Sequence, residues 1–202
     1  MKKYSAIALI EFSSIANGIL AADAMVKKAP ISMLKSGTVS RGNFLVLIGG
    51  SVASVEEAYA EGLSRGENFI VDKVILPDIH PIVHDAILGK RRPFDGEAIG
   101  VIETTTVATN IRAADSGIKG AFVGILEMRL ADGMGGKSFT IFSGAVENVS
   151  SAIEIARQSV EKQNYWLNST LIPRVDSEMA RQIETTTRFS VGHPQTLENG
   201  EA

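Results

Sequence analysis

The feature that most constrains the fold is an internal repeat, in which a segment near the start recurs in the second half of the 202-residue chain. Residues 6–29 read AIALIEFSSIANGILAADAMVKKA, and residues 98–121 read AIGVIETTTVATNIRAADSGIKGA. Glu11 in the first copy matches Glu103 in the second, at a constant offset of 92 residues and without a gap. Self-similarity of this kind indicates two copies of one structural unit.

The repeat continues beyond this first segment. Residues 50–58 match residues 144–152 at an offset of 94, because the second copy has a longer loop before that point. Residues 74–77, which read VILP, match residues 170–173, which read TLIP. The two copies therefore account for most of the chain.

The copies are joined by a charged stretch that contains Pro93 and Gly96, residues typical of a linker. We predict a first domain over residues 1–92 and a second domain over residues 96–184. The remaining segment, residues 185–202, is polar and lacks periodicity, so we expect it to form a flexible tail.

Within each copy the hydrophobic pattern predicts the order β-α-β-β-α-β. The elements expected in the first copy are a strand at 6–10, a helix capped by Ser13 or Ser14 and ended by Pro30, strands at 31–39 and 44–48, a helix at 53–64 and a strand at 69–76. The apolar face of the first helix is expected to consist of Ile15, Ile19, Ala22, Val26 and Ala29. This order is typical of the α+β ferredoxin-like unit, an α/β sandwich in which both helices cover one face of an antiparallel sheet.

Composition and charge exclude several classes of function. The net charge of −3 provides no basic surface for a phosphate backbone, so nucleic acid is not expected as a partner. No apolar stretch reaches the roughly 20 residues that span a bilayer, and the start lacks a signal-peptide cleavage pattern. We therefore expect a cytoplasmic protein with no membrane partner. The absence of cysteine excludes disulfides, thiolate metal sites and cysteine-ligated iron–sulfur clusters.

The residues that suggest catalysis or metal binding do not form a complete set. Glu11 and Glu103 end their strands at equivalent positions, and a duplicated carboxylate is more typical of a structural role than of a catalytic pair. His80 and His84 are four residues apart, but Pro81 begins that turn and no third ligand is near in the sequence. We predict no catalytic residue, no metal and no cofactor, and hence a protein that is not an enzyme.

The repeated motifs resemble those of the bacterial microcompartment shell family. The resemblance rests on A-I-x-x-I-E, A-A-D-x-x-x-K, a Gly-x-Val/Ala turn before the second helix and an Ile/Leu-Pro ending, and it covers about 180 residues. The chain is most similar to the tandem-domain, trimeric members of the PduT type. The resemblance implies a homotrimer that mimics a hexamer and forms a tile in a protein shell. Its implied partners are other shell proteins at the tile edges, encapsulated enzymes, and small metabolites that pass through a central pore.

The resemblance also implies roles for particular residues. The loop between the second and third strands of each domain would line the pore. In this sequence the matching pore residues are Thr38, Val39, Ser40, Arg41 and Gly42 in the first domain, and Asp132, Gly133, Met134, Gly135 and Gly136 in the second. Members of the PduT type carry a cysteine in the first loop, where three copies hold an iron–sulfur cluster. Ser40 stands at that position here, so no cluster is expected.

Four further residues are assigned to the tile edge. Lys27 and Lys119 match the family's edge lysine, which lies at contacts between neighbouring tiles. Asp23 and Asp115 precede them by four residues, a spacing that permits an ion pair on a helix. The alternative for these charges is a solvated helix face.

The first turn leads to a hypothesis about selectivity. Three copies of Arg41 around an axis would favour anions over cations, whereas the alternative is an ordinary solvated hairpin residue. A second class of function also remains open, in which the trimer binds a small molecule, cofactor or metal on its threefold axis.

Overall fold

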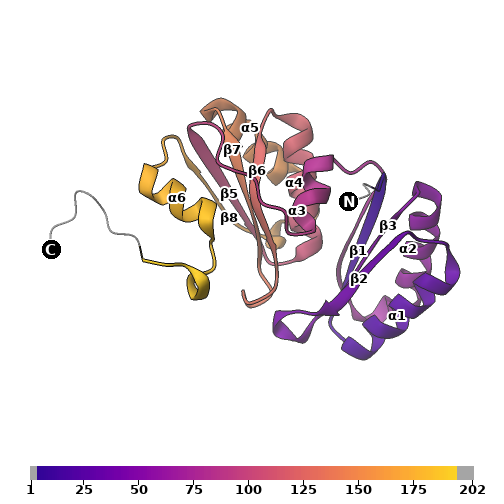
Figure 1. Ribbon diagram of the computed structural model, residues 1–202. Coiled ribbons are helices and arrows are strands. Elements are labelled where there is room, and N and C mark those ends of the chain that lie inside the picture. Colours follow the sequence, from indigo (N-terminus) through magenta and orange to yellow (C-terminus); the bar gives the residue numbers. More distant parts are fainter. Residues whose placement is uncertain (1–3, 195–202) are drawn as a thin grey trace.

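The structure is a computed structural model that describes residues 4–194 and consists of two domains of the same topology (Figure 1). The first domain contains β1 (Ala6–Phe12), α1 (Ile15–Lys28), β2 (Met33–Thr38), β3 (Phe44–Gly50), α2 (Val52–Gly66), β4 (Ile70–Leu76) and α3 (Pro81–Ile87). The second contains β5 (Ala98–Thr104), α4 (Val107–Gly120), β6 (Gly124–Leu130), β7 (Ser138–Gly144), α5 (Val146–Gln158), β8 (Trp166–Ile172) and α6 (Ser177–Thr185).

Each domain is built on one four-stranded antiparallel sheet. The strand orders are β2-β3-β1-β4 and β6-β7-β5-β8, which are the same order in the two copies. Two long helices pack on one face of each sheet, α1 and α2 in the first domain and α4 and α5 in the second. The predicted α+β, ferredoxin-like fold and its duplication are therefore confirmed.

The pairing of the strands defines which residues are equivalent in the two domains. Asp72 of β4 lies opposite Glu11, and Asn168 of β8 lies opposite Glu103. The last strands are thus related by an offset of 96 residues, compared with 92 at the first strands. This correspondence allows the environment of each residue to be compared with that of its counterpart.

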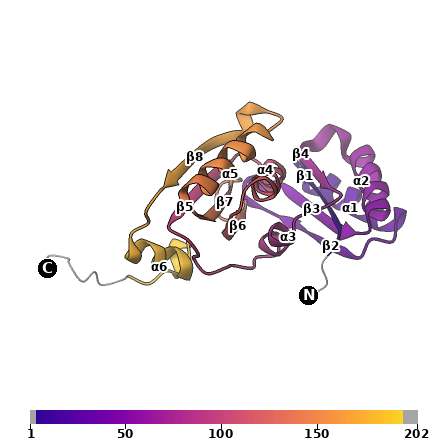
Figure 2. The same cartoon turned by 90° about the horizontal axis from the view of Figure 1, so that it is seen from above.

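The two domains lie side by side, and the second packs α4 against β4 of the first (Figure 2). One continuous apolar cluster includes residues of both domains, among them Leu9, Val74, Val83, Ile111 and Ile118. The core is therefore continuous across the boundary. Within residues 4–194 no helix is long and apolar enough to cross a membrane.

The start of α1 is as predicted, but its buried face is not. Ser14 is the cap, because its side chain accepts a hydrogen bond from the backbone N–H of Asn17. The buried residues are Gly18, Ala21, Ala22 and Met25, together with Ala29 at the helix end. Of the predicted face only Ala22 and Ala29 are buried, whereas Ile15, Ile19 and Val26 are 41%, 54% and 47% exposed. Small residues face the sheet because α1 lies very close to β3.

Two short helices were not anticipated from the sequence. Each follows the last strand of its domain, with α3 after β4 and α6 after β8. Asp176 caps α6 by accepting hydrogen bonds from the N–H groups of Glu178 and Met179. Thr185 ends this helix, and Thr187 donates a hydrogen bond of 2.6 Å to Glu127 of β6, so the chain remains attached to the second domain past the predicted start of the tail. Residues 195–202 of that predicted tail lie outside the described residues.

The close approach of α1 to β3 leads to a stability prediction. A Cβ at Gly18 would lie 2.6 Å from Cδ1 of Phe44, well inside van der Waals contact. We expect Gly18→Ala to lower the free energy of unfolding by about 2 kcal/mol, since overpacking outweighs the better helix propensity of alanine. Gly37→Ala on β2 is the matched control, because a Cβ there meets no atom within 4 Å. Equal denaturation midpoints for the two variants would contradict this account.

Candidate functional site

The two predicted pore loops lie against each other within one chain. Both are turns at the same end of the molecule, at the bottom of Figure 1. The backbone N–H of Gly133 donates a hydrogen bond of 2.9 Å to the Ser40 hydroxyl. Gly136 packs against the side chain of Arg41, so closely that a Cβ on Gly136 would lie 2.5 Å from Cδ of Arg41. The structure therefore brings the two turns together as one surface feature.

The backbone of both turns enters the left-handed region. Arg41 and Gly42 each have a φ of 75°, and Gly133, Gly135 and Gly136 also have positive φ. This conformation is easy for glycine but uncommon for a side chain such as that of Arg41. The glycine-rich second turn also leaves room for Arg41 to lie across Gly136, so the two turns fit each other.

Most of the predicted pore residues are accessible. Thr38, Arg41 and Gly42 are exposed in the first turn, as are Asp132, Gly133 and Gly135 in the second. Val39, Ser40 and Met134 are half-buried, and Gly136 is buried under Arg41. Both turns thus present polar and charged groups to the surface.

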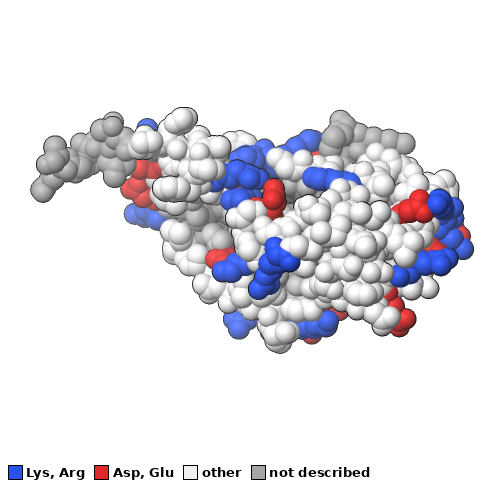
Figure 3. Space-filling view, turned by 90° about the horizontal axis from the view of Figure 1, so that it is seen from below, with Lys and Arg blue, Asp and Glu red and all other residues white. Residues whose placement is uncertain are grey.

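A small cavity lies next to the turns. It has a volume of about 230 Å³ and is open to solvent. Its lining includes apolar residues of the first-domain sheet and charged residues of both domains, among them Lys35, Leu47, Ile87 and Asp132. Figure 3 shows the molecule from below, with charged groups on the second domain and at the far end of the first, and an uncharged area on the first domain between them.

The four predicted edge residues form two equivalent ion pairs in different surroundings. Lys27 and Asp23 are 2.5 Å apart on α1 and both exposed. Lys119 and Asp115 are 2.7 Å apart on α4, but Asp115 is buried and accepts a hydrogen bond of 2.8 Å from the backbone N–H of His80. Lys119 also donates to a backbone carbonyl of the first domain. The second pair therefore lies at the domain junction, whereas the first pair has no counterpart contact among residues 4–194.

The junction depends on a carboxylate that the sequence reasoning missed. Asp72 of β4 lies at the start of α4, where its Oδ2 accepts a hydrogen bond from the hydroxyl of Thr106. The same oxygen accepts two more from Thr109, one from the N–H at 3.1 Å and one from the hydroxyl at 2.7 Å. A carboxylate at a helix N-terminus satisfies free N–H groups and is favoured by the helix dipole. No local motif signals this role, because the helix belongs to the other domain.

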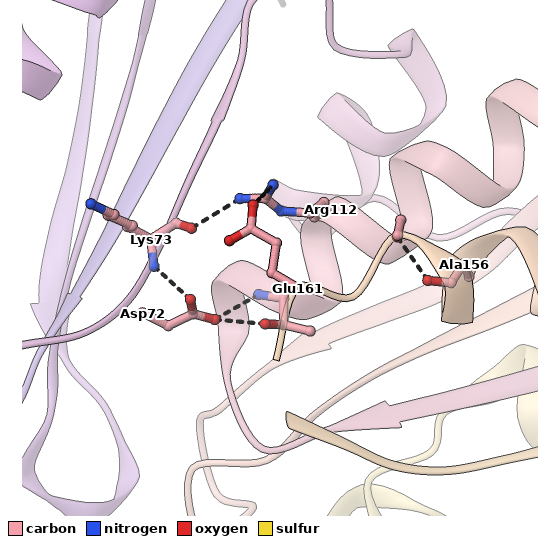
Figure 4. Close-up of polar contacts among 7 residues, drawn as sticks. Asp72, Lys73, Arg112, Ala156 and Glu161 are labelled. Atoms are coloured by element: carbon pink, nitrogen blue, oxygen red, sulfur yellow. Dashed lines mark hydrogen bonds and ion pairs between the residues drawn. The ribbon is translucent and has the colours of Figure 1, made fainter. Parts of the chain in front are cut away.

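Arg112 extends the same contact along α4. Its guanidinium donates to the backbone carbonyl of Lys73 on β4 and forms an ion pair with Glu161 (Figure 4). Tyr165 adds a hydrogen bond of 3.0 Å from its hydroxyl to the carbonyl of Val71. Backbone groups at the free edge of β4 are therefore occupied by side chains of the second domain.

Glu11 also has a structural role at this junction. Its carboxylate is buried and accepts hydrogen bonds from the side chain of Asn43, at 2.9 Å, and from the backbone N–H of Val107, at 3.1 Å. Burial raises the pKa of Glu11 above its ordinary value of 4.5, although both hydrogen bonds act in the opposite direction. Its equivalent, Glu103, has no such partner among the contacts within residues 4–194, so the two glutamates form no pair.

The histidines have structural positions. His80 caps α3 by accepting a hydrogen bond of 3.3 Å from the N–H of Ile82, and His84 is buried beside Tyr4. In the described part of the chain, no three His, Asp or Glu side chains are grouped to hold a metal ion. The structure does not bring the two histidines together with further ligands.

Comparison with known proteins shows the family. The BMC domain model matches residues 6–79 and 98–175, which are the two repeats. This chain belongs to the BMC-domain family. It is 37% identical to the bacterial microcompartment shell protein PduT of Citrobacter freundii, over 88% of this chain and 97% of that protein. The predicted tandem-domain shell family is thereby confirmed, and the chain is a microcompartment shell protein in keeping with the prediction that it is not an enzyme.

Other matches agree with this assignment. The carboxysome assembly protein CcmO of a Synechocystis strain is 25% identical over 91% of this chain and 66% of that protein. A microcompartment protein of Desulfitobacterium hafniense has a solved structure with a TM-score of 0.77 and 35% identity, covering 87% of this chain and 98% of that one. A fused permuted hexameric shell protein, MSM0275, shares the fold, with a TM-score of 0.57 and 19% identity over 79% of this chain and 86% of that one.

Glu11 leads to a prediction about the junction. Glu11→Ala leaves the N–H of Val107 without its acceptor in a buried site, so we expect the free energy of unfolding to fall by about 2 kcal/mol in denaturant titrations. Glu11→Gln is the control, because a glutamine can accept from Val107 and donate to a rotated Asn43 amide.

A comparison of the natural chain with Glu11→Gln tests the direction of the pKa shift of Glu11. A carboxyl group with a raised pKa in the folded state stabilises the fold most below its unfolded value, and this contribution falls as pH rises through the folded pKa. The natural chain should therefore be most stable, relative to Glu11→Gln, below pH 4.5 and lose that advantage at higher pH. A difference that grows with rising pH would contradict the direction of the shift.

Proposed function

We propose that three copies of this microcompartment shell protein close into a ring of six domains, which forms a tile with a pore at its centre. The proposal rests on the contact between the domains inside one chain, which provides a template for the contact between chains. If the second domain meets the first domain of the next chain in the same way, every contact is head-to-tail and a closed ring satisfies all of them. Three chains supply the six domains of the hexamer-like arrangement that the family resemblance implies.

The observation that carries the proposal is the difference in burial between the equivalent helices α1 and α4. Ile19 of α1 is 54% exposed, whereas its equivalent Ile111 of α4 is fully buried. Val26 is 47% exposed, compared with 6% for Ile118. The α4 residues are buried because this helix packs on β4 of the first domain. Helix α1 therefore carries the same apolar face, but no domain within the described part of the chain covers it.

The missing partner of α1 also has an equivalent in the chain. Strand β8 corresponds to β4 and lies at the opposite end of the molecule from α1 (Figure 2). Its Leu167 and Ile172 are 41% and 37% exposed. An exposed apolar face at each end of a chain is the pattern expected of a subunit that joins copies of itself.

The polar groups of the two contacts are also matched. Within the chain, Asp72 accepts hydrogen bonds at the start of α4, including one from the Thr109 hydroxyl. The equivalents of these residues are Asn168 on β8 and Asn17 on α1. A carboxylate facing a hydroxyl is thus replaced by an amide facing an amide, which preserves a donor and an acceptor across the contact.

The pore follows from the position of the turns. The two turns of one chain lie side by side at the same end of the molecule, so the ring would gather three such pairs around its axis. The first turn would contribute Ser40 and Arg41, and the second the glycine-rich segment 133–136. We assign to this pore the passage of small metabolites. In the ring, the exposed pair Asp23 and Lys27 would take the position that Asp115 and Lys119 have within the chain. The lysines would face neighbouring shell tiles. Any encapsulated enzymes would lie on the enclosed side of the shell.

Ile19→Asp tests the ring directly. The substitution places a carboxylate in a contact that becomes apolar and buried, and an unpaired buried charge costs several kcal/mol. We expect the mass in solution to fall from three chains to one chain of 21.5 kDa, as measured by sedimentation or native mass spectrometry.

Ala53→Glu is the matched control for Ile19→Asp. It introduces the same charge at an exposed position of α2, where the second domain already carries Glu147. This variant should remain trimeric. A natural chain that is monomeric at micromolar concentration, or an Ile19→Asp variant that stays trimeric, would refute the proposed contact.

Arg41 tests the pore. Three guanidinium groups near a narrow axis favour anions, so Arg41→Ala should reduce the anion-to-cation permeability ratio of reconstituted tiles by several-fold. Arg41→Lys retains the charge and should keep most of the preference. If the ratio is unchanged in Arg41→Ala, this residue does not control the pore.

A further inference from the structure

The helix at the end of the second domain is a second copy of the helix at the end of the first. Residues 77 and 173 are equivalent prolines that end β4 and β8, and the same offset of 96 places Pro81–Ile87 on residues 177–183, the first seven residues of α6. In Figure 1 both helices lie on the left side of the domain that precedes them. Helix α3 therefore shows what a helix in this position does when a neighbouring domain is present.

Helix α3 is buried between the two domains. Val83 and Ile87 are 0% and 5% exposed, and α3 contacts β6 and α4 of the second domain. The chain after α3 then covers the free edge of β6, because the backbone N–H of Arg92 donates to the carbonyl of Leu126. The apolar residues Ile125 and Leu126 of that strand are each 1% exposed. The helix and linker thus seal an edge strand of the adjoining domain.

Helix α6 has the same inner contact but lacks the outer one. Ile183, the equivalent of Ile87, is 7% exposed and packs on the second-domain sheet with Ile99 and Leu126. Met179, the equivalent of Val83, is 51% exposed. The position that is fully buried in α3 is therefore open in α6, where Met179 borders a surface hollow lined by residues 186–189 and is not covered by the first domain within residues 4–194.

The surface that would receive α6 is also exposed within the single chain. Leu34 of β2 lies opposite Ile48, as Ile125 of β6 lies opposite Phe142, so Leu34 and Ile125 are equivalent. Leu34 is 45% exposed, compared with 1% for Ile125. An edge strand with a free apolar side chain is a site for unwanted pairing unless something covers it.

From these two open surfaces we propose that α6 is an intersubunit clamp, which packs across β2 and α1 of the next copy of this chain in the ring. The inference rests on the proposed trimer, but it assigns a second contact, distinct from the packing of α1 on β8. Met179 would lie beside Leu34 of the neighbour, while Thr187 keeps its hydrogen bond to Glu127 of its own domain. Each chain would thus close the exposed strand of the next.

Site-specific photo-crosslinking tests the clamp in the full-length protein. A diazirine-bearing analogue of methionine at position 179 changes the side chain little and reacts only with groups in contact. We expect irradiation to give a covalent dimer band, and mass spectrometry to join the 177–185 peptide to a peptide that contains Leu34. The same residue at position 83 should join α3 to β6 within one chain, and at the exposed position 53 it should give a crosslinked yield at least 10-fold lower.

The outcomes separate the clamp from the trimer. If native mass spectrometry of the same sample shows a trimer and position 83 reacts as described, but position 179 gives no link to the β2 peptide, then the clamp is overturned and the ring stands. If the sample contains only single chains, the proposed trimer fails and the clamp fails with it. An intermolecular link from position 179 to any segment other than β2 or α1 also overturns the clamp.

Discussion

The contact between β4 of the first domain and the start of α4 in the second is the constraint on which the rest of the structure depends. Two carboxylates of the first domain, Asp72 and Glu11, bind N–H groups that a helix start would otherwise leave to water. The apolar surface beside them continues into a single core that spans both domains. The relative position of the domains is thereby fixed by hydrogen bonds at the junction as well as by hydrophobic packing, and it determines how the two turns lie relative to each other.

This constraint also explains why one chain contains exposed apolar surface at both ends. The first helix of each repeat carries an apolar face that packs on the sheet of a preceding domain. The first repeat has no preceding domain, so this face of α1 stays exposed among the described residues. The same reasoning applies to the terminal helices, with α3 buried and α6 open. In the ring that we propose, the first-domain α1 and the second-domain β8 are the two halves of one contact that is completed between chains.

The sequence predicted the topology well because the repeat and the strand-helix pattern are local properties. For similar reasons it predicted a cap at Ser13 or Ser14, of which Ser14 is the cap, a spacing on α1 and α4 that permits the ion pairs observed there, and a structural role for Glu11. The prediction of the buried face of α1 was wrong. Periodicity identifies the apolar positions of a helix, but it does not distinguish those that pack on the sheet of the same domain from those that lie on its outer surface. Gly18 and Ala21 face the sheet because the helix lies close to Phe44. The close packing that requires small residues there is not visible in the hydrophobicity of individual residues. Asp72 was missed because its partners are 34 and 37 residues away in another domain.

The two copies have also diverged in a way that only a tandem chain permits. In the first domain Gly18 makes room for Phe44 between α1 and the sheet, whereas the equivalents in the second domain are Asn110 and Ser138, both fully buried. The turns have diverged as well, into one that carries Arg41 and one rich in glycine, and they fit because the glycines leave space for the arginine. A ring of six identical domains would repeat a single turn six times and crowd six arginines at the axis. In the ring that we propose, alternation of two unlike turns would halve that charge and give each arginine a glycine-rich surface to lie on, which is a physical reason for a shell tile to be built from fused, non-identical repeats.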